Sequence, residues 1–235
     1  MSFDDQAVVR VQYADEANLR ARKALWEQAE GEDPKEVLWQ TLEAWQPRRV
    51  LEVGGGEGEL AERMQRELGA VVSFVDYSPR MVELARARGV DAQEGDVQEL
   101  PFADGTFDTA VAAWMLYHVP DLDAGLSELA RVLVDGGALI AVTNSAGHIS
   151  ELRELLAYPR NAFQMTFNSE NGEEHLRRYF SGVERYDTLM TATVHERQTL
   201  VDYRNSVSVP TSEVPDDVEL PFVVHGRSTI FVATK

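Results

Sequence analysis

The chain has 235 residues, of which 44% are hydrophobic, a formal net charge of −18 at pH 7 and no cysteine. This length and hydrophobic content suit one substantial α/β domain, whereas the lack of cysteine excludes disulfides, thiolate metal sites and cysteine nucleophiles. The negative charge disfavours nucleic acid as a partner, because phosphate binding depends on Lys and Arg.

The sequence lacks a membrane span, which needs about 18 consecutive apolar residues. Its first residues, Met-Ser-Phe-Asp-Asp, have neither the basic start nor the apolar core of a signal peptide. We therefore expect a cytoplasmic protein with no membrane association.

Two helical patterns open the chain. Residues 15–30 place Leu25 and Trp26 among charged residues, and a second helix is predicted from Asp33-Pro34, which suit the N-cap and first helical position. Apolar strand-like segments then alternate with amphipathic segments, which is typical of βαβ units and a parallel sheet. The predicted strands of this part are 50–53, 71–75, 90–93, 107–112 and 138–142, and the predicted helices are 59–68, 78–89 and 121–134.

The pattern changes after Thr143. A long strand over 183–194 and a final strand over 228–233 predict an antiparallel hairpin added to the sheet edge. Helices are predicted over 149–157, 173–180 and 195–206. The whole predicts an α/β fold: a doubly wound, mostly parallel seven-stranded sheet with an antiparallel last strand and an N-terminal helical cap.

A glycine-rich turn follows the first predicted strand, where residues 50–58 read Val-Leu-Glu-Val-Gly-Gly-Gly-Glu-Gly. Gly54, Gly56 and Gly58 permit positive φ angles and close approach of a ligand to the backbone. The next helix would present its free N–H groups at this turn. A dinucleotide-binding fingerprint would need glycine where this chain has Glu59, which argues against an NAD-dependent oxidoreductase. A tight turn with no ligand is the alternative.

Three acidic residues follow consecutive predicted strands, at the edge where open α/β sheets bind ligands. Glu52 lies beside the glycine turn, Asp76 follows the second strand and Asp96 follows the third. The spacing of Asp76 from the turn is typical of an acid that binds ribose hydroxyls. A carboxylate at position 96 can accept from an exocyclic amine such as that of adenine.

These features together resemble class I S-adenosylmethionine-dependent methyltransferases of the small-molecule type. The turn resembles their motif I, and Asp-Val-Gln-Glu-Leu-Pro-Phe-Ala-Asp-Gly-Thr-Phe-Asp at 96–108 resembles their "GD…LPF.D..FD" signature. Residues 114–121 resemble the "LHHV.D" element, and residues 126–137 resemble "E..RVLKPGG", with Val-Asp in place of Lys-Pro. The resemblance implies a Rossmann-like fold and S-adenosyl-L-methionine as cofactor.

The resemblance also implies roles for residues of this chain. Glu52 and the turn would hold the methionine part of the cofactor, Asp76 the ribose, and Asp96 the adenine. The implied cofactor-binding residues are Tyr13, Glu52, Gly54, Gly56, Gly58, Asp76, Tyr77, Asp96, Val97, Ala113 and Trp114. Ala113 and Trp114 would line the sulfonium end.

His148 is the one candidate for a general base, because it follows the fifth predicted strand on the ligand side. Catalytic residues are otherwise not identified, and methyl transfer requires a base only where the attacking atom carries a proton. His175, His195 and His225 do not form a helical metal pair, and no metal site is expected.

We expect a single methyltransferase domain over residues 1–235, with a helical cap at 1–46, a cofactor-binding core at 47–143, and substrate-side insertions and closing strands at 144–235. The expected reaction is in-line methyl transfer to a small-molecule O, N or C nucleophile. A non-catalytic cofactor-binding partner or regulatory subunit is the main alternative, and a tRNA-modifying methyltransferase is a further one. The sequence leaves the acceptor open, and also the choice between monomer and homodimer.

Overall fold

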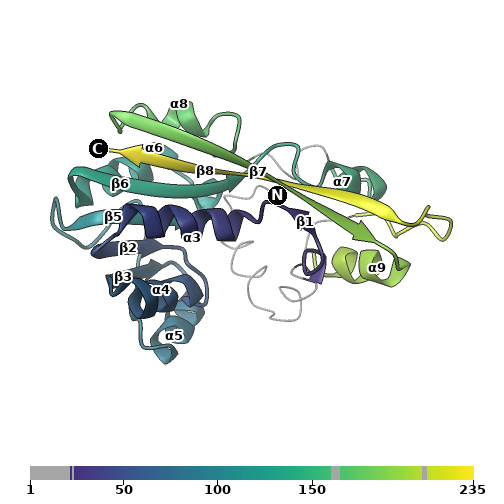
Figure 1. Cartoon of the computed structure of the whole chain (residues 1–235), viewed down its shortest axis with the longest axis horizontal. Helices are drawn as coiled ribbons and strands as arrows, with labels where there is room; N and C mark the ends of the chain where they lie inside the picture. Colours follow the sequence, from purple (N-terminus) through teal and green to yellow (C-terminus); the bar gives the residue numbers. More distant parts are fainter. Residues whose placement is uncertain (1–21, 23, 160–164, 208–210) are drawn as a thin grey trace.

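The computed structural model describes residues 22, 24–159, 165–207 and 211–235, which form an α/β structure around one eight-stranded sheet (Figure 1). The strand order is β1-β7-β8-β6-β5-β2-β3-β4. The strands are β1 (Glu30–Gly31), β2 (Arg49–Val53), β3 (Val71–Asp76), β4 (Asp91–Glu94), β5 (Phe107–Ala113), β6 (Leu133–Asn144), β7 (Gly182–Val194) and β8 (Phe222–Thr234). The helices are α3 (Pro34–Trp45), α4 (Glu59–Arg63), α5 (Pro79–Ala87), α6 (Leu122–Val132), α7 (Ser150–Leu155), α8 (Gly172–Leu176) and α9 (Arg197–Asn205), with a π-helical turn η1 (Met64–Leu68) and a 3₁₀ turn η2 (Leu116–His118).

The sheet confirms the predicted fold class. Strands β4, β3, β2, β5 and β6 run parallel, and β8 lies antiparallel between β6 and β7. The strand order reverses at β2, which has β3 on one side and β5 on the other. Ligands of open α/β sheets bind at such a switch point, outside the carboxyl ends of the strands.

The helix predicted over residues 15–30 was wrong at its C-terminal end. Residues 25–28 form a turn, and β1 (Glu30–Gly31) adds a short antiparallel strand to β7, with Glu30 opposite Thr191. Gly31 has φ +114° and lies so close to the carbonyl of Leu189 that a side chain would clash with it. The edge of β7 therefore captures this segment, and Glu32 donates its N–H to Leu189 at 3.1 Å.

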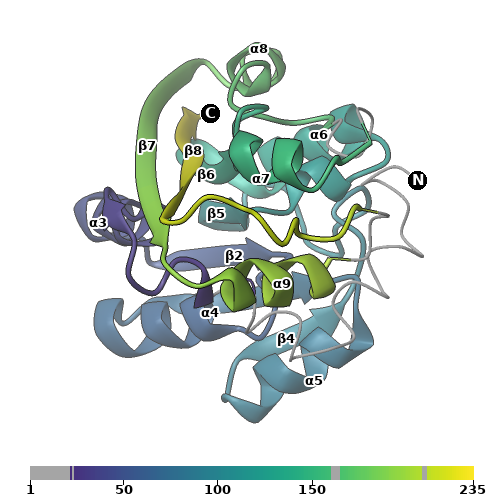
Figure 2. The same ribbon diagram turned by 90° about the vertical axis from the view of Figure 1, so that its right-hand side faces the viewer.

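Helices cover both faces of the sheet (Figure 2). Helices α6 and α8 pack on one face, against a core that includes Leu126, Leu139 and Phe231. Helices α3, α4 and α5 pack on the other face. Helix α3, predicted as part of an N-terminal cap, buries Leu42 against this face instead of lying over the ligand edge.

A smaller core extends beyond the carboxyl ends of the parallel strands. The pairing of β6 with β8 ends at Asn144 and Ser228, so residues 222–227 of β8 and their partners in β7 continue past β6. Helices α7 and α9 pack on this extension, as Figure 1 shows at its right. Its interior is apolar and includes Leu152, Leu200 and Val224. None of the helices in the described part of the chain is long and apolar enough to cross a bilayer.

Candidate functional site

The glycine turn lies at the switch point, between β2 and α4. Gly54 has φ +63° and donates its N–H to Val75 of β3 at 2.8 Å. A Cβ on Gly54 would lie 2.7 Å from Cβ of Met115, and one on Gly58 would lie 2.8 Å from Cβ of Ala85. Packing alone therefore requires glycine at positions 54 and 58. Gly56 differs: it has φ +60°, and a Cβ there would meet no atom of the described residues within 4 Å. The side of Gly56 on which a Cβ would lie is thus open.

Glu52 is the most unusual residue of the site, because its side chain is buried in β2 with only 1% exposure. Burial and, secondarily, the nearby negative charge of Asp76 raise the pKa of Glu52 to about 8. Its Oε2 has no hydrogen-bond partner among the residues that the structure describes. A buried carboxyl with an unused oxygen is energetically costly. The site therefore fits a ligand that brings a positive charge or a hydrogen-bond donor.

Asp76 lies at the end of β3 and is coupled electrostatically to Glu52. Its carboxylate accepts the N–H of Ser78 at 2.8 Å and also bonds to the backbone N–H of Gly56, which fixes the carboxylate against the turn. Burial raises the pKa of Asp76 to about 6 despite these bonds. The structure thus brings together Glu52, Gly56 and Asp76, as the sequence predicted. Tyr77, next in the chain, is 37% exposed.

Asp96 follows β4 and is held by Gln98, a residue that the sequence analysis did not single out. The amide Nε2 of Gln98 lies 2.9 Å and 2.8 Å from the two carboxylate oxygens of Asp96. The side-chain Oε1 of Gln98 accepts the backbone N–H of Asp121 at 2.9 Å, and this bond orients the side-chain amide. Val97 between them is buried in the core that α6 and α8 cover.

Ala113 ends β5, and Trp114 follows with φ +55°, an unusual conformation for a bulky residue. The backbone N–H of Trp114 donates to Val142 at 2.8 Å, and its indole Nε1 donates to Oδ1 of Asn144 at 3.1 Å. The same oxygen accepts from Oγ of Ser228 at 2.9 Å. Neither Asn144 nor Ser228 carries a sequence signal, because only the pairing of β6 with β8 brings them to Trp114.

His148 is held by the backbone of Arg227. Its Nδ1 lies 3.2 Å from the carbonyl oxygen and 3.1 Å from the backbone nitrogen of that residue. Burial lowers the pKa of His148 to about 4. Its ring lies 5.9 Å from that of Trp26. The role of His148 as a general base stays a prediction. Tyr13 lies outside the described residues.

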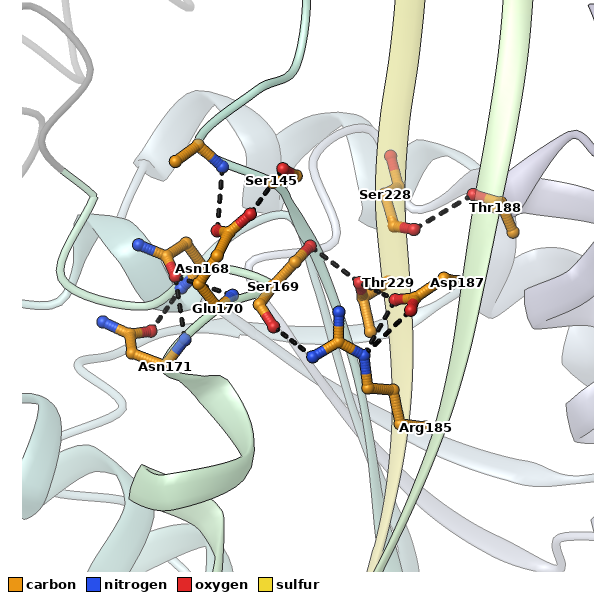
Figure 3. Close-up of polar contacts among 11 residues, drawn as sticks. Ser145, Asn168, Ser169, Glu170, Asn171, Arg185, Asp187, Thr188, Ser228 and Thr229 are labelled. Atoms are coloured by element: carbon orange, nitrogen blue, oxygen red, sulfur yellow. Dashed lines mark hydrogen bonds and ion pairs between the residues drawn. The ribbon is translucent and has the colours of Figure 1, made fainter.

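A polar cluster fixes the loop that follows β6 (Figure 3). Glu170 accepts from Oγ of Ser145 at 2.6 Å and from the backbone N–H of Ala146 at 2.9 Å. Asp187 of β7 accepts from Oγ1 of Thr229 at 2.6 Å and from Arg185 at 2.9 Å. Ser169 joins the two groups, because its hydroxyl accepts from Oγ1 of Thr229 at 2.7 Å and its carbonyl accepts from Arg185 at 2.6 Å. The cluster therefore ties residues 168–171 to β7, β8 and the end of β6.

Comparison with known proteins connects this geometry to a family. Residues 51–141 match the family model described as "Methyltransferase domain". A demethylmenaquinone methyltransferase from Thermus thermophilus is 38% identical over 103 residues, which cover 41% of this chain and 47% of that protein. A ubiquinone biosynthesis O-methyltransferase from Xanthomonas oryzae is 41% identical over 102 residues, 40% of this chain and 42% of that protein.

The match to the family model lies in the part of the chain that carries the glycine turn and the acids. The matched segment spans less than half the length of the curated relatives. Among solved structures, the YcgJ protein from Bacillus subtilis has a TM-score of 0.61 at 18% identity, covering 86% of this chain and 98% of that one. That likeness supports the fold.

Proposed function

We propose that this chain, which carries a class I S-adenosylmethionine-dependent methyltransferase domain, transfers the methyl group of its cofactor to a small-molecule acceptor. S-adenosyl-L-methionine supplies a methyl group that its sulfonium has already activated. The protein therefore has to bind the cofactor, align the acceptor and exclude water. The acceptor's nucleophilic atom gains the methyl, the sulfur keeps the bonding electron pair, and any proton lost from the acceptor passes to solvent.

The single observation that carries the proposal is the buried carboxyl of Glu52 beside the open backbone of Gly56. A carboxylate there pairs with the ammonium group of the methionine part, and the ion pair offsets the cost of burial. Asp76 binds the ribose hydroxyls, because its two oxygens can accept from both. Asp96, at the end of the next strand, binds the adenine amine once Gln98 shares or releases its carboxylate.

An aromatic quinol-type ring is the first acceptor class to test. Two relatives are named for menaquinone and ubiquinone biosynthesis, although they match only part of this chain. Oxygen and carbon of such a ring are both nucleophilic in the reduced form, so the product's structure identifies the atom.

Calorimetric titration with S-adenosylmethionine, with NAD as a control, tests the cofactor assignment. We expect micromolar binding of S-adenosylmethionine, no binding of NAD, and a loss of more than tenfold, about 1.4 kcal/mol, in Asp76→Ala. Reduced demethylmenaquinone and a polyphenol are then offered as acceptors, with mass spectrometry of the products. Absence of S-adenosylmethionine binding would refute the proposal. Cofactor binding without transfer to any acceptor would favour the non-catalytic alternative.

A further inference from the structure

Asn144 is the last residue of β6 and lies at the ligand edge of the sheet. Strand β6 runs parallel to β5, with Val142 opposite Ala113, so that Asn144 stands beside Trp114, which follows β5. Open α/β sheets bind ligands outside these carboxyl ends. Residues 137–143 of β6 are buried, whereas Asn144 is only partly buried. A polar side chain therefore stands where the buried strand ends.

Two donors from neighbouring segments fix the side-chain amide of Asn144. The indole Nε1 of Trp114 lies 3.1 Å from one atom of this amide, and because an indole N–H can only donate, that atom is Oδ1. Oγ of Ser228, on β8, donates to the same oxygen at 2.9 Å. Ser228 is 5% exposed, and its carbonyl accepts from Oγ1 of Thr188 at 3.2 Å (Figure 3). The oxygen is thus held from both sides of β6.

The nitrogen of the same amide is not used in this way. Nδ2 of Asn144 donates to none of the residues that the structure describes. In that part of the chain it is also not one of the fully buried polar atoms that lack a partner, in contrast to Oε2 of Glu52. Rotating the amide would break both bonds to its oxygen. Asn144 therefore ends β6 with a preorganised hydrogen-bond donor that a ligand can reach.

The chemistry of the crevice indicates which reactant this donor serves. The acids at the other strand ends, Glu52, Asp76 and Asp96, only accept hydrogen bonds when ionised, which suits the ammonium, hydroxyl and amino groups of the cofactor. The sulfonium is positively charged and cannot accept from an N–H group. A donor beside the end of β5 therefore suits an electron-rich oxygen of the other reactant, the methyl acceptor.

We propose that Nδ2 of Asn144 donates a hydrogen bond to the oxygen of an acceptor hydroxyl, and that this bond selects phenol- or enol-type acceptors over amines. This inference rests on the proposed function. A donor to this oxygen favours its ionised form and lowers the pKa of the hydroxyl, so the proton passes to solvent without a protein base. An amine uses its single lone pair to attack the methyl group and has none left to accept the bond.

Binding of 4-nitrophenol to the full chain saturated with S-adenosylhomocysteine tests this inference without turnover. The ionised phenol is coloured, so absorbance at varied pH measures the pKa of the bound molecule. Nitrobenzene, which lacks the hydroxyl, is the control ligand. The wild-type protein should bind the phenolate and lower the pKa of the bound phenol.

Two substitutions of Asn144 isolate the donor. Asn144→Asp keeps an oxygen for Trp114 and Ser228 but replaces the N–H donor with an acceptor, and should weaken phenolate binding about 10-fold or more. Asn144→Ala removes the donor without adding charge, and should return the pKa of the bound phenol toward its value in solution. Asn205→Asp adds the same charge at an exposed residue of α9 and is the matched control, which should bind the phenolate as the wild type does.

The outcomes separate this inference from the proposed function. Unchanged phenolate affinity in both Asn144 variants, or no phenolate binding to the wild-type protein with S-adenosylhomocysteine bound, would overturn it while cofactor binding stands. Equal losses of 4-nitrophenol and nitrobenzene would show a packing role and also overturn it. A loss of S-adenosylhomocysteine affinity in Asn144→Asp would assign the donor to the cofactor's carboxylate instead. If S-adenosylhomocysteine does not bind the wild-type protein, the proposed function itself fails. Should Asn144→Ala not fold, Asn144→Asp still decides, because it keeps both bonds to the oxygen.

Discussion

Proton release on cofactor binding is the sharpest consequence of the buried Glu52. Its pKa of about 8 means that about nine-tenths of the carboxyl is protonated at pH 7 in the cofactor-free protein. Pairing with the ligand's ammonium group requires the carboxylate, so binding must expel that proton. An α-amino group of pKa about 7.7–8.0 is about nine-tenths charged at pH 7 and takes up only about 0.1 proton. With a further release of about 0.1 proton from Asp76, whose pKa is about 6, the net release at pH 7 is about 0.9 proton.

The same arithmetic fixes the pH dependence of the affinity. Below pH 8 the carboxylate fraction falls tenfold per unit, and above pH 8 the ligand's ammonium group is lost. Affinity for S-adenosylmethionine should therefore rise about 40-fold from pH 6 to pH 8, of which Asp76 contributes about twofold, and fall again at higher pH. At pH 8 release from Glu52 and uptake by the amine nearly cancel, so that net proton exchange approaches zero.

Calorimetry in phosphate and in Tris at the same pH measures this exchange, because the apparent binding heat changes with the buffer's ionisation heat in proportion to the protons released. Glu52→Gln removes the titrating group while keeping the shape of the side chain, and should bind weakly without buffer dependence. Identical heats in both buffers at pH 7 would refute the reasoning. So would an unchanged proton release in Glu52→Gln, since the proton would then come from another group.

Three further substitutions test individual features. The pKa of Glu52 in the folded protein lies above its ordinary value of 4.5. Ionising this carboxyl therefore destabilises the fold by an amount that is absent below about pH 4.5, grows with pH and is complete above about pH 8. In thermal scans, Glu52→Gln should raise the melting temperature of the cofactor-free protein at pH 8, and by less at pH 5. In Gly56→Ala the added methyl group meets no atom, and only the left-handed backbone costs about 1–2 kcal/mol. Chemical denaturation should therefore show modest destabilisation, while calorimetry should show more than tenfold weaker cofactor binding. Wild-type affinity would contradict a ligand at this backbone. Gly172→Val would place its Cβ 2.7 Å from the ring of Phe231, and overpacking of about 1–3 kcal/mol should lower the denaturation midpoint; an unchanged midpoint would show that α8 moves freely on the sheet.

The cofactor-binding half of the site could be predicted because its signals are local. Glu52 and Gly56 belong to one nine-residue segment, and Asp76 ends the next strand, so parallel strand order alone brings them together. The sequence did not distinguish the roles of the three glycines. In the structure, packing requires glycine at positions 54 and 58, whereas a Cβ at position 56 would meet open space.

The remaining parts depend on contacts between distant segments. Asn144 meets Ser228 across 84 positions, and Nδ1 of His148 contacts the backbone of Arg227, 79 positions away. Strand β1 exists because the edge of β7 accepts it, while its own sequence, Glu-Gly, has no strand signal. Helix α3 has an apolar stripe that suits a cap as well as a sheet face, and only its packing against Ile230 and Val232 of β8 decides between them.

Two features of the crevice work against folding, and their location argues for binding rather than for structure. Glu52 is buried with an unused oxygen, and Trp114 has a strained backbone. A glutamine and a glycine would relieve these costs without changing the fold around them. Glu52 lies on β2 and Trp114 directly follows β5, the neighbouring strand, and Glu52 offers a carboxylate to the ammonium group of the cofactor. The cofactor-free protein is thus destabilised where S-adenosylmethionine would restore stability, and binding should raise the melting temperature by an amount that grows with the ratio of the free ligand concentration to Kd.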